Sequence, residues 1–360
     1  MKIIVLLYAL FFFVQQPAAQ GCIAIRSNGG SCAAGMDALL EEKKTYGWVV
    51  AVNNRYFRSF RHFIGKEEQK QRVALGTEVV NHSFSSEIGL TRHLDRRWSL
   101  SLFVPLTANE RSSLYEHDGK KRNTTRSFGL GDVRMAAYYW LTDPVQHNRT
   151  KFQLGLGLKL PMGDFRYLDY FQRNDSTKVL GPVDQSIQLG DGGTGITTEV
   201  NVYHLFTKKT GLYANGYYLL NPREQNGVST ARGGVPSAAS LSYGSDVMSV
   251  PDQFMFRLGG QLSVEEFTFS AGMRIEGIPA KDIVGGSNGF RRPGYVLSAE
   301  SAVVYSFHKT QLYISIPFAV QRNRTQSIPD EIRTQKTGSY FKGDAAFADY
   351  SLNFGAVFSL

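Results

Sequence analysis

The chain ends on the stretch Tyr350-Ser351-Leu352-Asn353-Phe354-Gly355-Ala356-Val357-Phe358-Ser359-Leu360, which alternates without a break between apolar and small or polar side chains. A period of two over this length predicts a β-strand with one apolar face. About eleven residues is also the length that a tilted strand needs to cross a bilayer. The apolar face, which includes Phe354 and Phe358, therefore needs either a packed core or lipid against it.

The N-terminus has the form of an export signal. Met1 and Lys2 precede an apolar run over residues 3–14, and small and polar residues follow. This three-part pattern predicts a secretory signal peptide over residues 1–21. Beyond it, no apolar run reaches the roughly 18 residues of a membrane-spanning helix.

Residues 22–45 form a separate, irregular segment before the first strand. Export makes a disulfide chemically possible, and the only two cysteines are Cys22 and Cys32. They are interpreted as a local disulfide; the alternative is a free or lipid-anchored Cys22. Residues 33–44 could form a short helix that caps or plugs the domain predicted over residues 46–360.

About twelve segments in that domain have the pattern of β-strands. Their connections alternate in length: five are short, and the six others are long and polar. This arrangement predicts an all-β fold, a transmembrane antiparallel barrel with short periplasmic turns and long extracellular loops, in the outer membrane of a Gram-negative bacterium. The predicted strands are 46–56, 79–92, 98–107, 126–141, 151–161, 195–206, 211–220, 253–264, 267–277, 294–307, 310–321 and 346–360.

The strands also predict which side chains face the lumen. Aromatic residues gather near the strand ends, as interfacial girdles do, so the apolar face is placed in lipid. The opposite face carries charges of both signs, which either line a selective pore or fill the barrel with ion pairs. The predicted lumen residues are Arg55, Glu87, Asp132, Arg134, Lys159, Glu199, Arg257, Arg274, Glu276 and Glu300.

Proline recurs far along three strands, as Pro105, Pro161 and Pro317. Because proline cannot donate to a β-ladder, each could simply end a strand or could open the pairing there. The second interpretation makes the three residues candidates for a gap in the wall, through which an apolar solute leaves sideways into the membrane.

The sequence does not favour an enzyme. His82 and Ser83 are adjacent, which places their side chains on opposite faces of a strand and prevents a direct catalytic pair. There is no Gly-x-Ser-x-Gly elbow and no His-Glu-x-x-His motif. The run 190–195 lacks the Lys-Ser/Thr ending of a phosphate-binding loop and is interpreted as a hinge. No catalytic residue, metal or cofactor is predicted.

The net charge of the chain limits the kinds of partner that it can be expected to bind. The formal net charge of +9 is distributed over many loops, which is typical of solvated loop tips and also compatible with anionic lipid headgroups. Nucleic acid is not expected for an exported chain. The predicted partners are outer-membrane lipid, a small solute, and the outer-membrane assembly machinery through the C-terminal strand.

Three short, glycine-rich segments resemble a known family. They are 127–134 (SFGLGDVR) with 136–139, 154–164 (LGLGLKLPMGD) and 188–192 (QLGDG). They resemble the outer-membrane channels grouped with the phenol-degradation meta-pathway proteins, within the superfamily of fatty-acid and hydrocarbon channels. The resemblance implies passive diffusion of small hydrophobic or aromatic solutes. The Asn-Pro-Ala signature of the fatty-acid channels is missing, and the segment 22–32 stands in its place.

The function expected is thus passive uptake of small hydrophobic or aromatic compounds. Two alternatives remain: a closed barrel that binds a partner in the manner of an adhesin, and a membrane-embedded lipid hydrolase.

Overall fold

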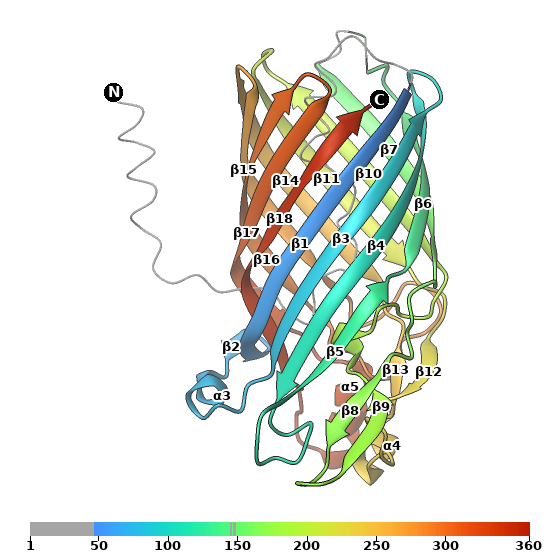
Figure 1. Cartoon of the computed structure of the whole chain (residues 1–360), viewed down its shortest axis with the longest axis vertical. Helices are drawn as coiled ribbons and strands as arrows, with labels where there is room; N and C mark the ends of the chain where they lie inside the picture. Colours follow the sequence, from blue (N-terminus) through green and yellow to red (C-terminus); the bar gives the residue numbers. More distant parts are fainter. Residues whose placement is uncertain (1–46, 145, 147–148) are drawn as a thin grey trace.

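The computed structural model describes residues 47–360 except 145, 147 and 148. The predicted signal peptide 1–21, the segment 22–45, and Cys22 and Cys32 lie outside the described residues. Figure 1 shows a barrel of tilted strands, with short connections at one end and a cap of loops and small elements at the other.

Twelve antiparallel strands form the wall, and β1 pairs with both β3 and β18, which closes the sheet on itself. Closure satisfies the backbone groups along the sheet and leaves no free edge to lipid. The wall strands are β1 (Gly47–Ile64), β3 (Val80–His93), β4 (Trp98–Ser113), β6 (Val133–Trp140), β7 (Thr150–Leu160), β10 (Gly195–Leu205), β11 (Thr210–Leu220), β14 (Gln253–Val264), β15 (Phe267–Ile278), β16 (Gly294–Phe307), β17 (Thr310–Arg324) and β18 (Ala345–Ser359).

The other elements belong mainly to the long loops at the capped end. Within the described residues, none of the helices is long and apolar enough to cross a membrane. These elements are β2 (Glu67–Glu68), α3 (Lys70–Ala74), β5 (Asn123–Leu130), β8 (Leu168–Gln172), β9 (Lys178–Pro182), η1 (Gln185–Ile187), β12 (Gln225–Ser229), α4 (Ala238–Tyr243), β13 (Val247–Ser249) and α5 (Ile328–Thr337).

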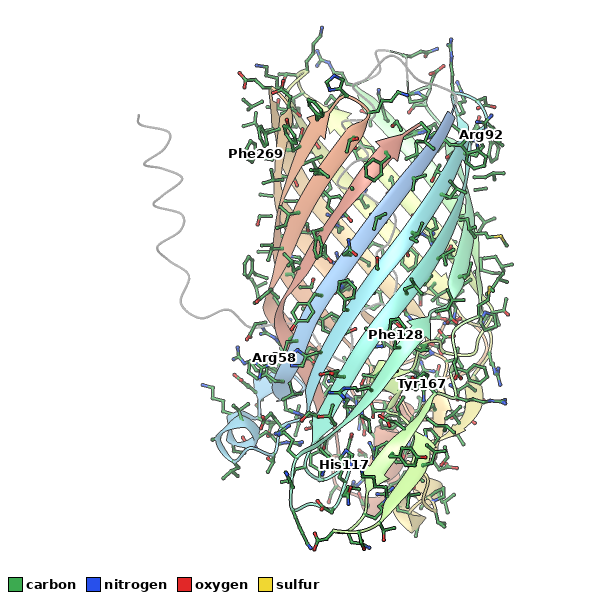
Figure 2. All side chains as sticks on the ribbon, viewed as in Figure 1. Arg58, Arg92, His117, Phe128, Tyr167 and Phe269 are labelled. Carbon is green, nitrogen blue, oxygen red and sulfur yellow. The ribbon has the colours of Figure 1, made fainter. Side chains whose placement is uncertain are left out.

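The two faces of the wall have opposite chemistry. On β18, Phe354 and Phe358 are exposed on the outer face, whereas Ser351 and Val357 are buried on the inner face. Figure 2 shows Phe269 of β15 pointing away from the barrel near the end with the short turns. A band of exposed apolar side chains around a polar interior is what lipid on the outside requires. The predicted fold class, a closed antiparallel barrel of about twelve strands with short turns at one end, is confirmed.

The predicted strand boundaries differ from the structure at one important place. The segment predicted as one strand, 126–141, is divided at Gly131–Asp132 into β5 and β6. β4 pairs with β6 as far as Phe103, and then with β5 from Leu106 onward. The divided segment therefore bends away from the cylinder at the level of Pro105.

A second irregularity separates β17 from β18. Their pairing ends at Phe318 and Tyr350, whereas β18 stays paired with β1 as far as Ala345. A cluster of buried apolar side chains fills the space behind this separation. Its members are Phe63, Val296, Ala319, Ala345 and Phe347.

Candidate functional site: a break in the barrel wall beside a polar cavity

The structure places the ten charged residues of the predicted lumen set inside the barrel. Nine have exposed fractions of 8% or less as whole residues, and the side chain of Asp132 is 8% exposed. Charged groups so deeply buried are stable only when they are paired and hydrogen-bonded. Most of them do form pairs, and the pairs fall into three groups.

The first group crosses the lumen. Arg55 of β1 donates from Nη2 to Glu276 Oε1 at 2.7 Å, although β1 and β15 are not neighbours in the wall. Glu276 also accepts from Arg274 at 2.5 Å, and the same arginine lies 4.0 Å from Glu300. Glu300 accepts in addition from Arg257 at 2.9 Å. We call these five residues the ion-pair belt.

The second group bridges β6 and β10 on the inner face of β7. Arg134 Nη1 forms an ion pair with Glu199 Oε1, and the Tyr138 hydroxyl donates to the same oxygen at 2.9 Å. β7 carries Gly155 at this place, where a Cβ would lie 2.7 Å from the Tyr138 ring and 3.0 Å from Glu199. Glycine is therefore required there, because any side chain would displace the bridge.

The third group lies where the wall is interrupted between β5 and β7. We find Pro105, Gly131, Asp132 and Pro161 together at this place. Gly131 N donates to Pro105 O at 2.8 Å, and the ladder between β6 and β7 ends at Val133, one residue after Asp132. β7 ends at Leu160, immediately before Pro161. We call this place the β5–β7 break.

Asp132 connects the loop between β7 and β10 to the break. Its Oδ1 accepts from Gly163 N at 3.1 Å, and its Oδ2 accepts from Asp191 N at 3.2 Å and from Lys159 Nζ at 3.3 Å. Lys159 also forms an ion pair with Asp191. A Cβ on Gly190 would lie 2.5 Å from Asp132 Oδ1, so the loop backbone approaches this carboxylate directly.

The three segments that carry the family resemblance meet here. Gly131 and Asp132 come from the first, Lys159 to Gly163 from the second, and Gly190 and Asp191 from the third. Sequence reasoning did not select Asp191, because its partner Asp132 is 59 positions away. The signal available was the motif itself, an aspartate between glycines.

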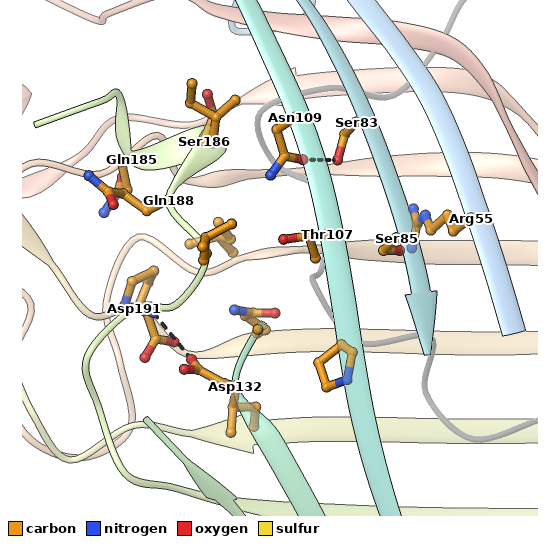
Figure 3. A pocket seen from close by; sticks show the side chains of 18 of the residues that line it. Arg55, Ser83, Ser85, Thr107, Asn109, Asp132, Gln185, Ser186, Gln188 and Asp191 are labelled. Atoms are coloured by element: carbon orange, nitrogen blue, oxygen red, sulfur yellow. Dashed lines mark hydrogen bonds between the residues drawn. The ribbon is translucent and has the colours of Figure 1, made fainter. Parts of the chain in front are cut away.

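A cavity of about 130 Å³ adjoins the break on its inner side. Figure 3 shows the side chains that line it, with hydrogen bonds joining Asn109 to Ser83 and Asp191 to Asp132. Its lining combines hydroxyl, amide and apolar side chains with charged groups of both signs, including Arg55, Arg134, Lys159 and Arg292. The lining used below includes Phe57, Ser83, Ser85, Glu87, Pro105, Thr107, Asn109, Asp132 and Leu189.

A buried cluster of charges in the cap adjoins the cavity, because its member Arg292 also lines the cavity. Arg292 donates from Nη2 to Asp184 Oδ2 at 2.8 Å, and Arg111 donates to Glu116 at 2.6 Å. Arg232 bridges the two carboxylates, at 2.8 Å from Glu116 and 3.5 Å from Asp184. Burial by itself would raise the pKa of Asp184, but the charges of the arginines outweigh it and hold that pKa well below its ordinary value. The same balance lowers the pKa of Glu116.

The remaining candidates lie elsewhere. Pro317 faces inward on β17, and the pairing of that strand with β18 is interrupted there between Ser315 and Phe318. His82 and Ser83 lie on opposite faces of β3: Ser83 donates to Asn109 inside, and His82 contacts the Tyr56 hydroxyl on the outer face. Among the described residues, no group of His, Cys, Asp and Glu side chains could hold a metal ion.

A closed antiparallel barrel with an apolar outer face is the form in which β-proteins span the bacterial outer membrane. The chain is therefore an outer-membrane β-barrel. No family model and no curated protein matches the sequence.

Solved structures give a similarity of fold. An outer-membrane channel from Pseudomonas putida F1 superposes with a TM-score of 0.57 at 12% identity, covering 88% of this chain and 96% of that one. The toluene transporter TodX from Pseudomonas putida gives 0.44 at 10% identity, covering 96% and 99%. The translocator domain of the autotransporter NalP from Neisseria meningitidis gives 0.43 at 10% identity, covering 92% and 98%. Only the first score identifies a shared fold, and it does not by itself assign a function.

Proposed function

We propose that the protein is an outer-membrane channel for passive uptake of small hydrophobic or aromatic solutes, and that the solute leaves the lumen sideways through the β5–β7 break. The observation that carries the proposal is the position of the cavity, which is lined by Pro105, Gly131 and Asp132 of the break itself. At Gly131 and Asp132 the cavity adjoins the interruption between β5 and β6, and the loop between β7 and β10 contacts the wall there through Asp132.

The route straight down the barrel is unfavourable for such a solute. The ion-pair belt crosses the lumen between β1 and β15, and its charges are satisfied by one another. An apolar molecule pushed between Arg55 and Glu276 would separate the pair and leave buried charges without partners, which costs several kcal/mol. The sideways route requires that the loop residues Gly163 and Asp191 move away from Asp132, and that Asp191 also leave Lys159 and Asn226.

Proline explains why the wall can open at this level. Within a strand, the N–H and C=O of one residue point to the same neighbour, and the carbonyl of Pro105 accepts from Gly131. The missing N–H of Pro105 therefore faces the break, so the wall lacks one rung where the loop must move.

A reversible cross-link tests the proposal. The double variant Asp132→Cys/Asp191→Cys, made with Cys22 and Cys32 replaced by serine, places two sulfurs across the break without adding a side chain at a glycine. In proteoliposomes loaded with an enzyme that traps the solute, oxidation should lower uptake of labelled toluene about tenfold or more, and reduction should restore it.

The matched control is Ile314→Cys/Phe354→Cys in the same background. These residues are direct partners on β17 and β18. Their cross-link should leave uptake unchanged. Equal uptake by the oxidised and reduced forms of the first variant would refute the sideways route. Uptake no faster than through empty liposomes would favour the alternative of a closed, partner-binding barrel.

A further inference from the structure

Among the described residues, Glu87 is a buried carboxylate of the lumen that forms no ion pair. Five carboxylates at the belt, the bridge and the break each lie within 4.0 Å of an arginine or lysine nitrogen. They are Asp132, Asp191, Glu199, Glu276 and Glu300. In the described part of the chain, Glu87 has no such ion pair, although it is only 5% exposed and lines the cavity. A buried carboxylate in this position is expensive unless something pairs with it.

Glu87 makes one weak hydrogen bond, and the residue that donates it is itself fixed by a third residue. Asn53 Nδ2 donates to Glu87 Oε1 at 3.4 Å, and the Tyr313 hydroxyl donates to Asn53 Oδ1 at 2.8 Å. Tyr313 thus fixes the amide so that its N–H side faces the carboxylate. A single amide donor at this distance leaves most of the acceptor capacity of Glu87 unused.

The nearest candidate for a counter-charge is already occupied. Arg134 pairs with Glu199, and its guanidinium lies 4.0 Å from the Phe103 ring and 5.9 Å from the Tyr217 ring. These rings contact its faces, while Nε and Nη2 of Arg134 make no hydrogen bond among the described residues. Arg134 therefore forms no ion pair with Glu87 and acts on it only through longer-range electrostatic attraction.

Two hydroxyls stand beside Glu87 on the same inner face. Ser85 lies two residues before it on β3, and Thr107 is the direct partner of Ser85 on β4. The Thr107 hydroxyl is buried without a hydrogen-bond partner. Side chains so related on one face lie close enough to contact one molecule. The group thus offers one carboxylate and two hydroxyl oxygens to the cavity.

We propose that Glu87, Ser85 and Thr107 form a binding subsite for the protonated amino group of an amphiphilic solute. An ammonium has three N–H donors and one positive charge, which matches these three acceptors and the unpaired carboxylate. The hydrocarbon part would lie against Phe57 and Leu189, toward the break. This inference rests on the proposed channel function and adds amphiphiles with a cationic head to its substrates.

Equilibrium binding tests the subsite separately from transport. Protein in phosphatidylcholine nanodiscs is titrated at neutral pH with octylamine, octan-1-ol and octanoate, and binding to empty nanodiscs is subtracted. Wild type should bind octylamine more tightly than octan-1-ol. Glu87→Gln, which keeps the shape and removes the charge, should weaken octylamine binding about tenfold or more and leave octan-1-ol unchanged. Glu266→Gln, which removes a carboxylate from the exposed turn between β14 and β15, should leave the preference for the amine unchanged.

Other outcomes decide against the subsite. If Glu87→Gln is folded, as judged by its heat-dependent migration on gels, and binds octylamine as wild type does, the assignment is wrong. Tighter binding of octanoate than of octylamine would also overturn it, while leaving the channel function in place. If none of the three compounds binds wild type above empty nanodiscs, the channel function and the subsite both fail.

Discussion

The barrel wall is irregular at two places, and the two are filled in opposite ways. At the separation of β17 and β18, beside Pro317, a dry cluster fills the space, with Phe63 and Phe347 packed edge to face at 5.4 Å between ring centroids. At the β5–β7 break, the filling is a loop backbone joined to Asp132. Apolar packing has no single contact whose loss releases it, whereas the loop at the break is held by separate polar contacts, including those of Asp132 and the ion pair of Asp191 with Lys159. A proline in the wall therefore indicates an opening only where the segment that fills the adjacent space can move away.

The largest effect is expected in the packed separation. Phe347 is fully buried, so Phe347→Ala should reduce the free energy of unfolding by about 3–5 kcal/mol. Urea titration of protein folded into phosphatidylcholine vesicles, followed by tryptophan fluorescence, measures this. Phe354→Ala on the lipid-facing side of the same strand is the control and should cost clearly less. Equal losses in the two variants would show that the cluster behind β18 is not a packed core.

A smaller loss of stability with a larger change in function is expected at the break. Asp132→Asn removes the ion pair with Lys159 and one acceptor for the loop amides, so unfolding should become easier by about 1–3 kcal/mol. Uptake of labelled toluene should rise several-fold because the loop is released. Asp164→Asn, in the same loop but exposed, should change neither quantity. A stable Asp132→Asn protein with unchanged uptake would contradict the role given to Asp132.

The difference between the two places also shows how far sequence reasoning reaches. The strands were predictable because lipid and lumen impose opposite chemistries on alternate residues, as Phe354 and Ser351 show on β18. The placement of Arg274 and Glu276 followed from the same alternation. The break was not predictable in this way, because 126–141 reads as one strand and Asp191 reads as part of a hinge. Its partner Asp132 lies 59 residues away, and only the fold brings two such positions together.

Acid should loosen the cap above the break. The pKa values of Asp184 and Glu116 are lower in the folded protein than their ordinary values. Their stabilising contribution is therefore fully present above about pH 4, the range of an unperturbed carboxyl, and is lost as pH falls through the lower folded values. Hydrogen exchange measured at pH 3, after correction for the intrinsic rate, should show reduced protection of residues 112–118 and 183–188 relative to pH 7.

The double variant Asp184→Asn/Glu116→Gln is the control for this pH dependence. It removes both titrating carboxyls, so protection of the two segments should be low at both pH values. The apolar cluster behind β18 has no such group among its members, so protection of residues 345–348 should fall less than that of the cap. Equal loss of protection in both regions would mean that acid acts on the whole barrel.

The smallest effect is expected when each of the two prolines is replaced by alanine, and the two substitutions should differ in their effect on uptake. Pro105→Ala supplies an N–H that faces Gly131 across the break, because the carbonyl of the same residue already accepts from that glycine. One added hydrogen bond is worth about 0.5–1.5 kcal/mol, so the closed wall should be favoured and uptake of labelled toluene should fall about two- to tenfold. Pro317→Ala adds an N–H to a wall whose opening is blocked by Phe347 and its neighbours, so uptake should stay the same. If both substitutions lowered uptake equally, solutes would also be passing through the β17–β18 separation. The presence of a packed apolar cluster would then not show that an irregularity in the wall is closed to solutes.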